Sequence, residues 1–297
     1  MDRKFLFLLN PIAGTGKRSV VKRTIEKKAK EKNIFFEIAP SVPSGDYTFL
    51  RDKIESEQIT DIVVAGGDGT LSQVTGSLLG THVNFGIIPC GSGNGLALAA
   101  GIPRHPGKAL DVIFNGRVSE VDAFTINDRF SCMLSGLGLD AQVAHDFAKQ
   151  KKRGLATYVK QTFRNFFSAH PYSFRLVAKE KNLSTHAYFI SIANGNQFGH
   201  QFTIAPKASL HDGLLDIVVV QKMSKWQLIP AIWQQLKFGD VNENKLNHKG
   251  IVYFQTRQLD IYNLEGAPLH IDGDPATTAE KLSIRIIPSA FRLYQPA

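Results

Sequence analysis

The sequence predicts two domains: an N-terminal α/β domain built on a parallel sheet, and a mainly antiparallel, β-rich C-terminal domain. Two observations lead to this fold class. Short apolar strands alternate with helical segments over residues 1–121, and glycines mark the junctions. After Val121, strands follow one another with few helices between them. The 297 residues, 43% of them hydrophobic, are ample to bury a sizeable core.

Each strand expected in the first half is a short apolar run. These runs lie at residues 5–9, 35–38, 62–65 and 85–88. Val21, Ile25 and Ala29 form one apolar stripe with helical spacing after the first strand. Further helices are expected at 47–56, 71–79 and 96–100. This alternation of strand, turn and helix predicts a parallel sheet with helices on both faces.

The second half begins with an expected hairpin, in which Asn127 and Asp128 form the turn after a strand at 124–126. Further strands are expected at 173–178, 187–193, 216–220, 251–254, 259–262 and 282–287, and helices at 155–167 and 225–238. The domains are therefore placed at 1–121 and 122–297, with the last residues able to return to the first domain. No linker rich in Ser, Gly or Pro separates them, which predicts two domains packed around a shared cleft.

The charge balance favours polyanionic partners, because 35 Lys and Arg against 26 Asp and Glu give a net charge of +9. Phosphates, nucleic acid and an anionic membrane surface all satisfy this preference. Cys90 and Cys132 stand alone in the sequence, so neither a disulfide framework nor a thiolate metal site is expected. The apolar run at 5–9 is too short for a signal peptide or a membrane span. We expect a soluble, cytoplasmic protein.

The sharpest motif is the glycine-rich turn at Gly66, Gly67, Asp68, Gly69 and Thr70, which follows an apolar strand and opens a helix. A turn without side chains lets main-chain N–H groups approach phosphate oxygens, and the helix dipole adds positive charge there. The Asp68 carboxylate would repel phosphate unless a divalent cation bridges them or the carboxylate accepts a proton or hydrogen bond. The alternative is a tight turn in which Asp68 caps a helix.

Two more loops follow strand ends in the same half. One runs from Asn10 to Lys17, and the other contains Gly91, Ser92, Gly93, Asn94 and Gly95. Loops after parallel strands gather at one edge of the sheet, where open α/β sheets bind ligands. The first loop is not a Walker motif, because its glycine spacing differs and Arg18 follows the Gly-Lys pair.

Together these motifs resemble the catalytic domain of the diacylglycerol kinase and sphingosine kinase superfamily of lipid kinases. The second half continues the resemblance in the family's order, through Gly136–Ala141, Ala193–Gly195, Ala205–Pro206, Asp212–Asp216 and Asp272–Pro275. The resemblance implies phosphorylation of a lipid hydroxyl, as in diacylglycerol or a sphingoid base, with ATP and Mg2+ and in the cleft between the domains. It further implies a role in phospholipid biosynthesis, peripheral contact with an anionic membrane surface and no nucleic acid partner, and it leaves a homodimer open.

The resemblance also carries roles to single residues. Contacts with ATP are implied for Asn10, Ser41, Gly66, Gly67, Asp68, Gly69, Thr70, Leu71, Ser72 and Ser92. A Mg2+ site is implied at Asp212 with the main-chain carbonyls of Ser209 and Leu214, either structural or catalytic. Asp274 is the expected proton acceptor and Asp68 the competing one. The family usually has Glu where this chain has Asp274, and Gly91–Gly95 looks closer to the sphingosine and ceramide kinase branch.

Two other functions stay open. The NAD kinases share the Gly-Gly-Asp-Gly-Thr motif and a related two-domain plan, but their Asn-Glu motif is not evident, since Asn242-Glu243 lies in a polar stretch. A non-enzymatic nucleotide-binding regulator is the third alternative, favoured if Asp274 cannot act as a base.

Overall fold

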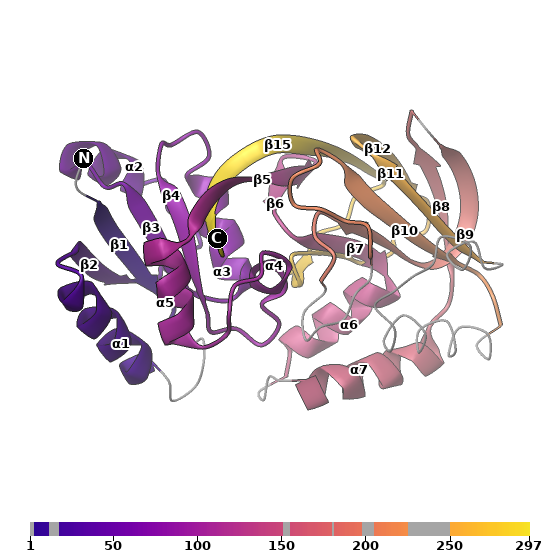
Figure 1. Ribbon diagram of the computed structural model, residues 1–297. Coiled ribbons are helices and arrows are strands. Elements are labelled where there is room, and N and C mark those ends of the chain that lie inside the picture. The colour runs from indigo at the N-terminus through magenta and orange to yellow at the C-terminus, as the bar shows by residue number, and fades with distance from the viewer. Residues whose placement is uncertain (1–2, 12–17, 151–154, 180, 198–204, 225–249) are drawn as a thin grey trace. The chain divides into compact units, whose positions relative to one another are not determined.

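The computed structural model describes residues 3–11, 18–150, 155–179, 181–197, 205–224 and 250–297 (Figure 1). The chain divides into two compact units. Unit 1 comprises residues 1–122 together with 288–297, and unit 2 comprises residues 123–287. Strand β5 (Arg117–Ile126) carries the chain out of unit 1, and β15 (Lys281–Gln295) brings it back.

Unit 1 is built on a parallel sheet. Its first four strands are β1 (Lys4–Leu9), β2 (Phe35–Pro40), β3 (Asp61–Gly66) and β4 (Asn84–Pro89). The strand order is β2-β1-β3-β4, and the end of β15 continues it by pairing parallel to β4 through Arg292 and Leu293. Its helices are α1 (Arg18–Glu31), α2 (Leu50–Glu57), α3 (Asp68–Ser77), α4 (Gly95–Ala99) and α5 (Pro106–Asn115).

Helices α1 and α5 cover one face of this sheet, as Figure 1 shows. The apolar stripe of α1 packs with Leu110 and Ile113 of α5 against Phe5, Phe7, Val63 and Ile88 of the strands. Right-handed crossovers place α3 on the other face, because β3 to β4 steps across the sheet in the opposite direction from β1 to β2. The buried Leu71 and Val74 of α3 pack there. The carboxyl ends of all four strands are therefore held at one edge of a well-packed layer.

Unit 2 is mainly antiparallel. Besides its parts of β5 and β15, its strands are β6 (Arg129–Ser131), β7 (Leu134–Gly138), β8 (Tyr172–Val177), β9 (Asn182–Ala193), β10 (Leu215–Gln221), β11 (Ile251–Thr256), β12 (Gln258–Asn263), β13 (Leu269–Ile271) and β14 (Asp274–Ala276). One path of pairing runs β14-β13-β7-β9-β8-β12-β15, and β10 pairs with β9 and β11. A core of aliphatic and aromatic side chains lies between these strands.

Two helices accompany the strands of unit 2. Helix α6 (Leu139–Ala148) begins directly after β7 and packs against α7 (Leu155–Ser168) and against β13 and β14. Gly138 connects β7 to α6 with φ +84°, and a Cβ there would meet the Tyr188 carbonyl oxygen at 2.4 Å. Only glycine fits this junction, which fixes the direction in which α6 leaves the sheet.

The expected elements that lie within the described residues agree with the structure in kind and order. The four parallel strands are confirmed, as are the α1 stripe, the hairpin at Asn127-Asp128 and the helix over 155–167. Helices α5 and α6 were not expected, because each follows a glycine-rich or polar stretch that resembles a loop. The expected helix at 225–238 lies outside the described residues. Within the described residues, no helix has the length and apolar character needed to cross a membrane.

Candidate functional site

The residues that directly follow β1 to β4 begin side by side at one edge of the unit 1 sheet, whereas residues 12–17 of the loop expected after β1 lie outside the described residues. The main-chain N–H of Asn10 donates to the Ala65 carbonyl at 3.0 Å, and that of Ser41 donates to the Leu9 carbonyl at 2.9 Å. The Cys90 N–H donates to the Gly66 carbonyl at 2.8 Å. These bonds extend the ladders of neighbouring strands, so the loop positions expected from the sequence do converge in unit 1.

The side chain of Asn10 joins the first of these loops to the start of α3. Its Nδ2 donates to Thr70 Oγ1 at 2.7 Å. Gly69 and Thr70 belong to the first turn of α3, where N–H groups have no acceptor within the helix and the dipole is positive. Leu71, by contrast, is fully buried, and its N–H donates to the Gly67 carbonyl. Its side chain is part of the core and is not available to a ligand.

The turn after β3, at residues 66–70, and the loop after β4, at residues 91–95, approach each other through their main chains. The loop at residues 91–95 is called the third loop below. A Cβ on Gly91 would stand 2.6 Å from Gly67 Cα, and a Cβ on Gly67 would stand 3.2 Å from Gly91 Cα. Cβ atoms essentially never come that close to another carbon, so Gly91 cannot carry a side chain unless the loops separate. The glycines at these two positions are therefore needed for the packing of the two loops.

Asp68 also connects these two loops. Its Oδ2 accepts the Gly95 N–H at 2.8 Å and its Oδ1 accepts the Leu96 N–H at 3.1 Å. These two N–H groups open α4, so Asp68 caps that helix from a neighbouring loop. This is the capping role that the sequence offered as an alternative, and the helix it caps is α4 rather than its own α3.

The third loop is closed by Asn94, a residue to which the sequence assigned no role. Its Oδ1 accepts the Gly91 N–H at 2.9 Å and its Nδ2 donates to the Gly91 carbonyl at 2.8 Å. Asn94 is buried with φ +57°, a conformation that asparagine tolerates better than most residues. The clamp leaves Ser92 exposed between Gly91 and Asn94. The clamp differs from the Asx turn that asparagine commonly forms, because Asn94 bonds three residues back rather than two residues forward.

In unit 2, a tight turn connects β13 to β14. Ile271 pairs with Asp274, so Asp272 and Gly273 form a two-residue turn, and both have positive φ, of 49° and 84°. Such values are typical of the type I′ turn, for which Asp-Gly is a favoured sequence. The turn therefore follows directly from the local sequence.

The Asp272 side chain anchors this turn. Its carboxylate is buried and accepts one hydroxyl and three successive main-chain N–H groups, at 2.7 to 3.1 Å. The donors are Ser131 Oγ and the N–H groups of Cys132, Met133 and Leu134. Asp274, two residues further on, is exposed. Two aspartates that look alike in the sequence thus differ completely in surroundings.

The residues expected to bind a metal lie in the turns before β10. Asp212 is exposed, and its Oδ1 accepts the Leu214 N–H at 3.0 Å. Ser209 Oγ accepts the His211 N–H at 3.3 Å in the same loop. Burial, together with the nearby Asp212 charge, raises the pKa of Asp216 to about 7, against the opposing effects of Gln255 and Lys207. Tyr253 also donates its hydroxyl to Asp216.

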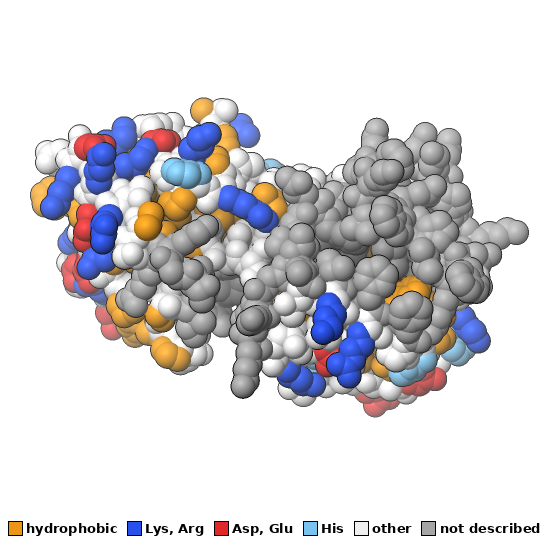
Figure 2. Space-filling view, turned by 90° about the horizontal axis from the view of Figure 1, so that it is seen from below, with side chains coloured by type: hydrophobic (Ala, Val, Ile, Leu, Met, Phe, Trp, Pro, Cys, Tyr) orange, Lys and Arg blue, Asp and Glu red, His pale blue; other side chains and the backbone are white. Residues whose placement is uncertain are grey.

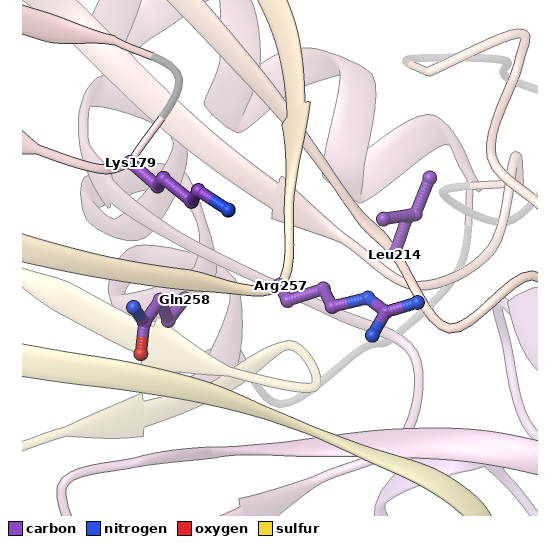
Figure 3. Close-up of a pocket in the computed structure, with 4 residues that line it drawn as sticks. All are labelled: Lys179, Leu214, Arg257 and Gln258. Carbon is purple, nitrogen blue, oxygen red and sulfur yellow. The ribbon is translucent and has the colours of Figure 1, made fainter.

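A hollow of about 390 Å³ lies beside Leu214 in unit 2. Figure 3 shows the four side chains drawn there, Lys179, Leu214, Arg257 and Gln258. The two cationic side chains come from the turns between β8 and β9 and between β11 and β12. Of the residues proposed from the sequence, this hollow contains Leu214 alone.

Comparison with known families accounts for almost the whole chain. Residues 4–126 match the diacylglycerol kinase catalytic domain, and residues 134–295 match the YegS C-terminal NAD kinase beta sandwich-like domain. The chain belongs to the YegS and diacylglycerol kinase family of lipid kinases. This assignment confirms the family that the sequence motifs resembled.

Individual relatives agree with the family. The chain is similar to "Probable lipid kinase YegS-like" of Chromohalobacter salexigens, with 27% identity over 85% of this chain and 81% of that protein. It is 25% identical to "Probable lipid kinase YegS" of Salmonella arizonae over 90% of this chain and 88% of that one. A crystal structure of a diacylglycerol kinase from Bacillus anthracis covers 99% of this chain and 97% of its own, with a TM-score of 0.80 and 22% identity. That likeness confirms the fold.

Membership of this lipid kinase family implies ATP and, typically, Mg2+, so we ask whether the loop before β10, where the sequence predicts a metal site, offers suitable ligands. Its donor set does fit: one exposed carboxylate and main-chain carbonyls are the hard oxygen ligands that Mg2+ prefers. The raised pKa of Asp216 indicates that negative charge is costly there, and a cation would relieve that cost. No group of three or more His, Cys, Asp or Glu among the described residues could hold a metal. Main-chain carbonyl oxygens and water would complete the coordination of such an ion.

Proposed function

We propose that this protein is a lipid kinase that transfers the γ-phosphate of ATP to a hydroxyl of a lipid such as diacylglycerol or a sphingoid base. The observation that carries the proposal is the environment of Asp274, an exposed carboxylate at the end of a turn that the buried Asp272 anchors through four hydrogen bonds. A carboxylate held in this way can accept the proton of an attacking hydroxyl.

In this proposal residues 1–121 bind ATP and residues 122–297 bind the lipid. The first turn of α3 and the exposed Ser92 loop offer main-chain N–H groups to the phosphates, and Asn10 and Ser41 border the same edge. Leu71 is left out of this group, because its side chain is in the core. Asp68 acts here by holding α4 and the third loop in place.

Asp212, with the carbonyl oxygens of Ser209 and Leu214, would hold Mg2+. When bound, such an ion supplies positive charge that offsets the carboxylates of this loop. The chain's own contribution to the reaction is to present Asp274 to the acceptor. Asp274 is one methylene shorter than the glutamate usual in the family and is intrinsically slightly more acidic.

The test compares Asp274→Asn with Asp274→Glu. The asparagine keeps the shape and cannot accept a proton, so kcat is expected to fall by about 10²- to 10⁴-fold, while the glutamate keeps substantial activity. Glu280→Gln, which removes an exposed carboxylate between β14 and β15, is the matched control and should leave kcat unchanged. Near-full turnover by a folded Asp274→Asn variant would assign the base elsewhere, with Asp68 the first candidate.

The acceptor is identified by comparing ATP turnover with diacylglycerol, a sphingoid base, NAD or no acceptor. Phosphorylation of one of the lipids is the expected result. Phosphorylation of NAD would make the protein an NAD kinase. Tight ATP binding without turnover on any acceptor would make it a nucleotide-binding regulator.

We further propose that the protein contacts anionic membrane surfaces peripherally during turnover. The net charge is +9, and Figure 2 shows exposed Lys and Arg side chains at several places among the residues that the structure describes. Such electrostatic attraction weakens with salt, since the Debye length falls from about 10 Å at 0.1 M to about 3 Å at 1 M. Rates on anionic vesicles should therefore fall with salt far more than rates on a soluble short-chain substrate. Identical salt profiles would remove the membrane contact from the proposal.

A further inference from the structure

A buried pair of polar side chains, His270 and Asp140, lies behind the Asp272-Gly273 turn. The function proposed above does not yet assign this pair a role. His270 of β13 is fully buried, and its Nε2 lies 3.0 Å from Asp140 Oδ2, in the first turn of α6. The Asp140 side chain is itself 9% exposed. Polar groups are costly to bury, so their hydrogen bonds matter to the local structure.

The second ring nitrogen of His270 reaches the turn itself. Gly273 donates its main-chain N–H to His270 Nδ1 at 3.2 Å. A nitrogen that accepts this bond carries no proton, so the proton of the neutral ring is on Nε2, which donates it to Asp140. Asp140 therefore fixes the tautomer and orientation that allow His270 to hold the Gly273 N–H.

The opposite strand leaves space for the pair. Gly136 of β7 stands across from His270 in the ladder. A Cβ at Gly136 would lie 2.6 Å from Asp140 Oδ2 and 3.0 Å from His270 Nε2. Because Gly136 has no side chain, the hydrogen bond between His270 of β13 and Asp140 of α6 can form. This bond joins the Gly136–Ala141 and Asp272–Pro275 motifs, which are distant in the sequence.

We infer that His270 is a positioning residue, which holds the turn before Asp274 through Gly273 while Asp140 orients its ring. The inference rests on the proposed function, in which Asp274 is the base. Asp272 anchors the turn through its carboxylate. His270 holds the next residue, Gly273, by accepting the main-chain N–H of that glycine. If the His270 contact is lost, the Asp274 carboxylate remains but is no longer held in position. We therefore expect kcat to fall while the affinity for ATP stays unchanged.

Two amide variants, each of which reproduces one ring nitrogen, separate the two contacts of the ring. In His270→Asn, the side-chain oxygen replaces Nδ1 and still accepts the Gly273 N–H. In His270→Gln, the amide nitrogen replaces Nε2 and still reaches Asp140, but no acceptor faces Gly273. We expect His270→Gln to lose about tenfold or more in kcat with KM for ATP within about twofold, and His270→Asn to keep most of kcat.

Hydrogen exchange of the Gly273 amide, measured by NMR, provides a readout that does not depend on catalysis. It should quicken at least about tenfold in His270→Gln and stay slow in His270→Asn, because only the latter keeps the acceptor. Asp140→Ala, on a different element, should quicken exchange and lower kcat in the same direction, and it replaces His270→Gln if that variant does not fold. His186→Gln, at an exposed histidine of β9, is the control and should change neither quantity.

Unchanged kcat in a folded variant with faster exchange at Gly273 would overturn the inference and leave the proposed function intact. Slow exchange in both His270→Gln and Asp140→Ala would overturn it as well, since the histidine would then not hold the turn. Failure of the proposed function shows itself separately, as full turnover by Asp274→Asn.

Discussion

Three aspartates show how one residue type takes different roles in this protein. The Asp68 carboxylate accepts two main-chain N–H groups of α4, and the buried Asp272 carboxylate accepts four donors around Ser131–Leu134. Asp274 is exposed. Carboxylates that accept several main-chain N–H groups stabilise loops, whereas an exposed carboxylate on an anchored turn is accessible to a ligand, as the proposed role of Asp274 requires.

Asp68→Asn should weaken ATP binding and destabilise unit 1. An amide has one accepting oxygen and turns its nitrogen toward the second N–H group, so either Gly95 or Leu96 loses its partner. We expect the free energy of unfolding to fall by about 1–3 kcal/mol, measured by urea denaturation. The Kd for ATP should rise in calorimetric titration, because the residue at position 68 then holds the start of α4 and the third loop less firmly.

The control for that change is Asp52→Asn, at an exposed aspartate in the first turn of α2. It should alter neither stability nor ATP binding appreciably. If Asp68→Asn loses kcat while its stability and Kd for ATP match those of the parent, Asp68 is the base rather than a cap.

Asp272→Asn should destabilise unit 2 by about 1–3 kcal/mol, because at least one buried N–H donor loses its acceptor and the bonds lose their charge. Differential scanning calorimetry measures the loss. Asp128→Asn is the matched control, since Asp128 also lies in a two-residue hairpin turn and is exposed. Equal melting temperatures for the two variants would show that the Asp272 contacts contribute nothing.

At the scale of elements, the ATP-binding edge proposed for unit 1 depends on how closely two loops approach. The turn after β3 and the turn after β4 touch through Gly67 and Gly91, and Asn94 closes the second of them. The parallel pairing of β3 with β4 brings the two glycines together, and α3 and α4 begin from that point.

Gly91→Ala should therefore weaken ATP binding by displacing the third loop. The new methyl group would stand 2.6 Å from Gly67 Cα, so the loops must separate. Gly80→Ala is the control: Gly80 has φ +78° and nothing within 4 Å of an added Cβ, so it should cost about 1–2 kcal/mol in stability and leave the Kd for ATP unchanged. Parent-like ATP binding by Gly91→Ala would show that the phosphates are bound elsewhere.

At the scale of the whole molecule, the chain returns to its first unit at the end. Residues 288–297 belong to unit 1, where Phe291, Leu293 and Tyr294 are buried. The Tyr294 hydroxyl donates to the buried Asp61, which also receives bonds from Arg3, Thr60 and Asn84. Burial and this contact with Asp61 raise the pKa of Tyr294 well above its usual value. Unit 1 is thus completed only by the last strand.

Leu293→Ala should lower the free energy of unfolding by about 2–5 kcal/mol, because it opens a cavity in the core beside β4. Arg292→Ala, one residue earlier and exposed, should change it by less than about 0.5 kcal/mol. Urea denaturation of both variants measures the difference. Similar losses for the two would mean that the returning strand contributes little to unit 1.

The elements whose patterns are local could be predicted from the sequence. The apolar runs of β1 to β4, the stripe of α1 and the Asn127-Asp128 turn are determined by side-chain periodicity and turn chemistry over a few residues. The convergence of Asn10, Gly67 and Gly91 was also predictable, because loops that follow parallel strands must gather at one edge. Helix α6 was missed, since its start lies within a glycine motif.

Only the tertiary structure decided which partners the polar side chains meet. Asp68 contacts α4, Asp272 contacts Ser131–Leu134, and His270 contacts Asp140, which lies 130 positions earlier in the chain. A carboxylate or imidazole has the same appearance in a sequence whether it is buried against donors or exposed. Its partners are set by the packing of distant segments, and the free energy of desolvation then determines which roles remain open to it.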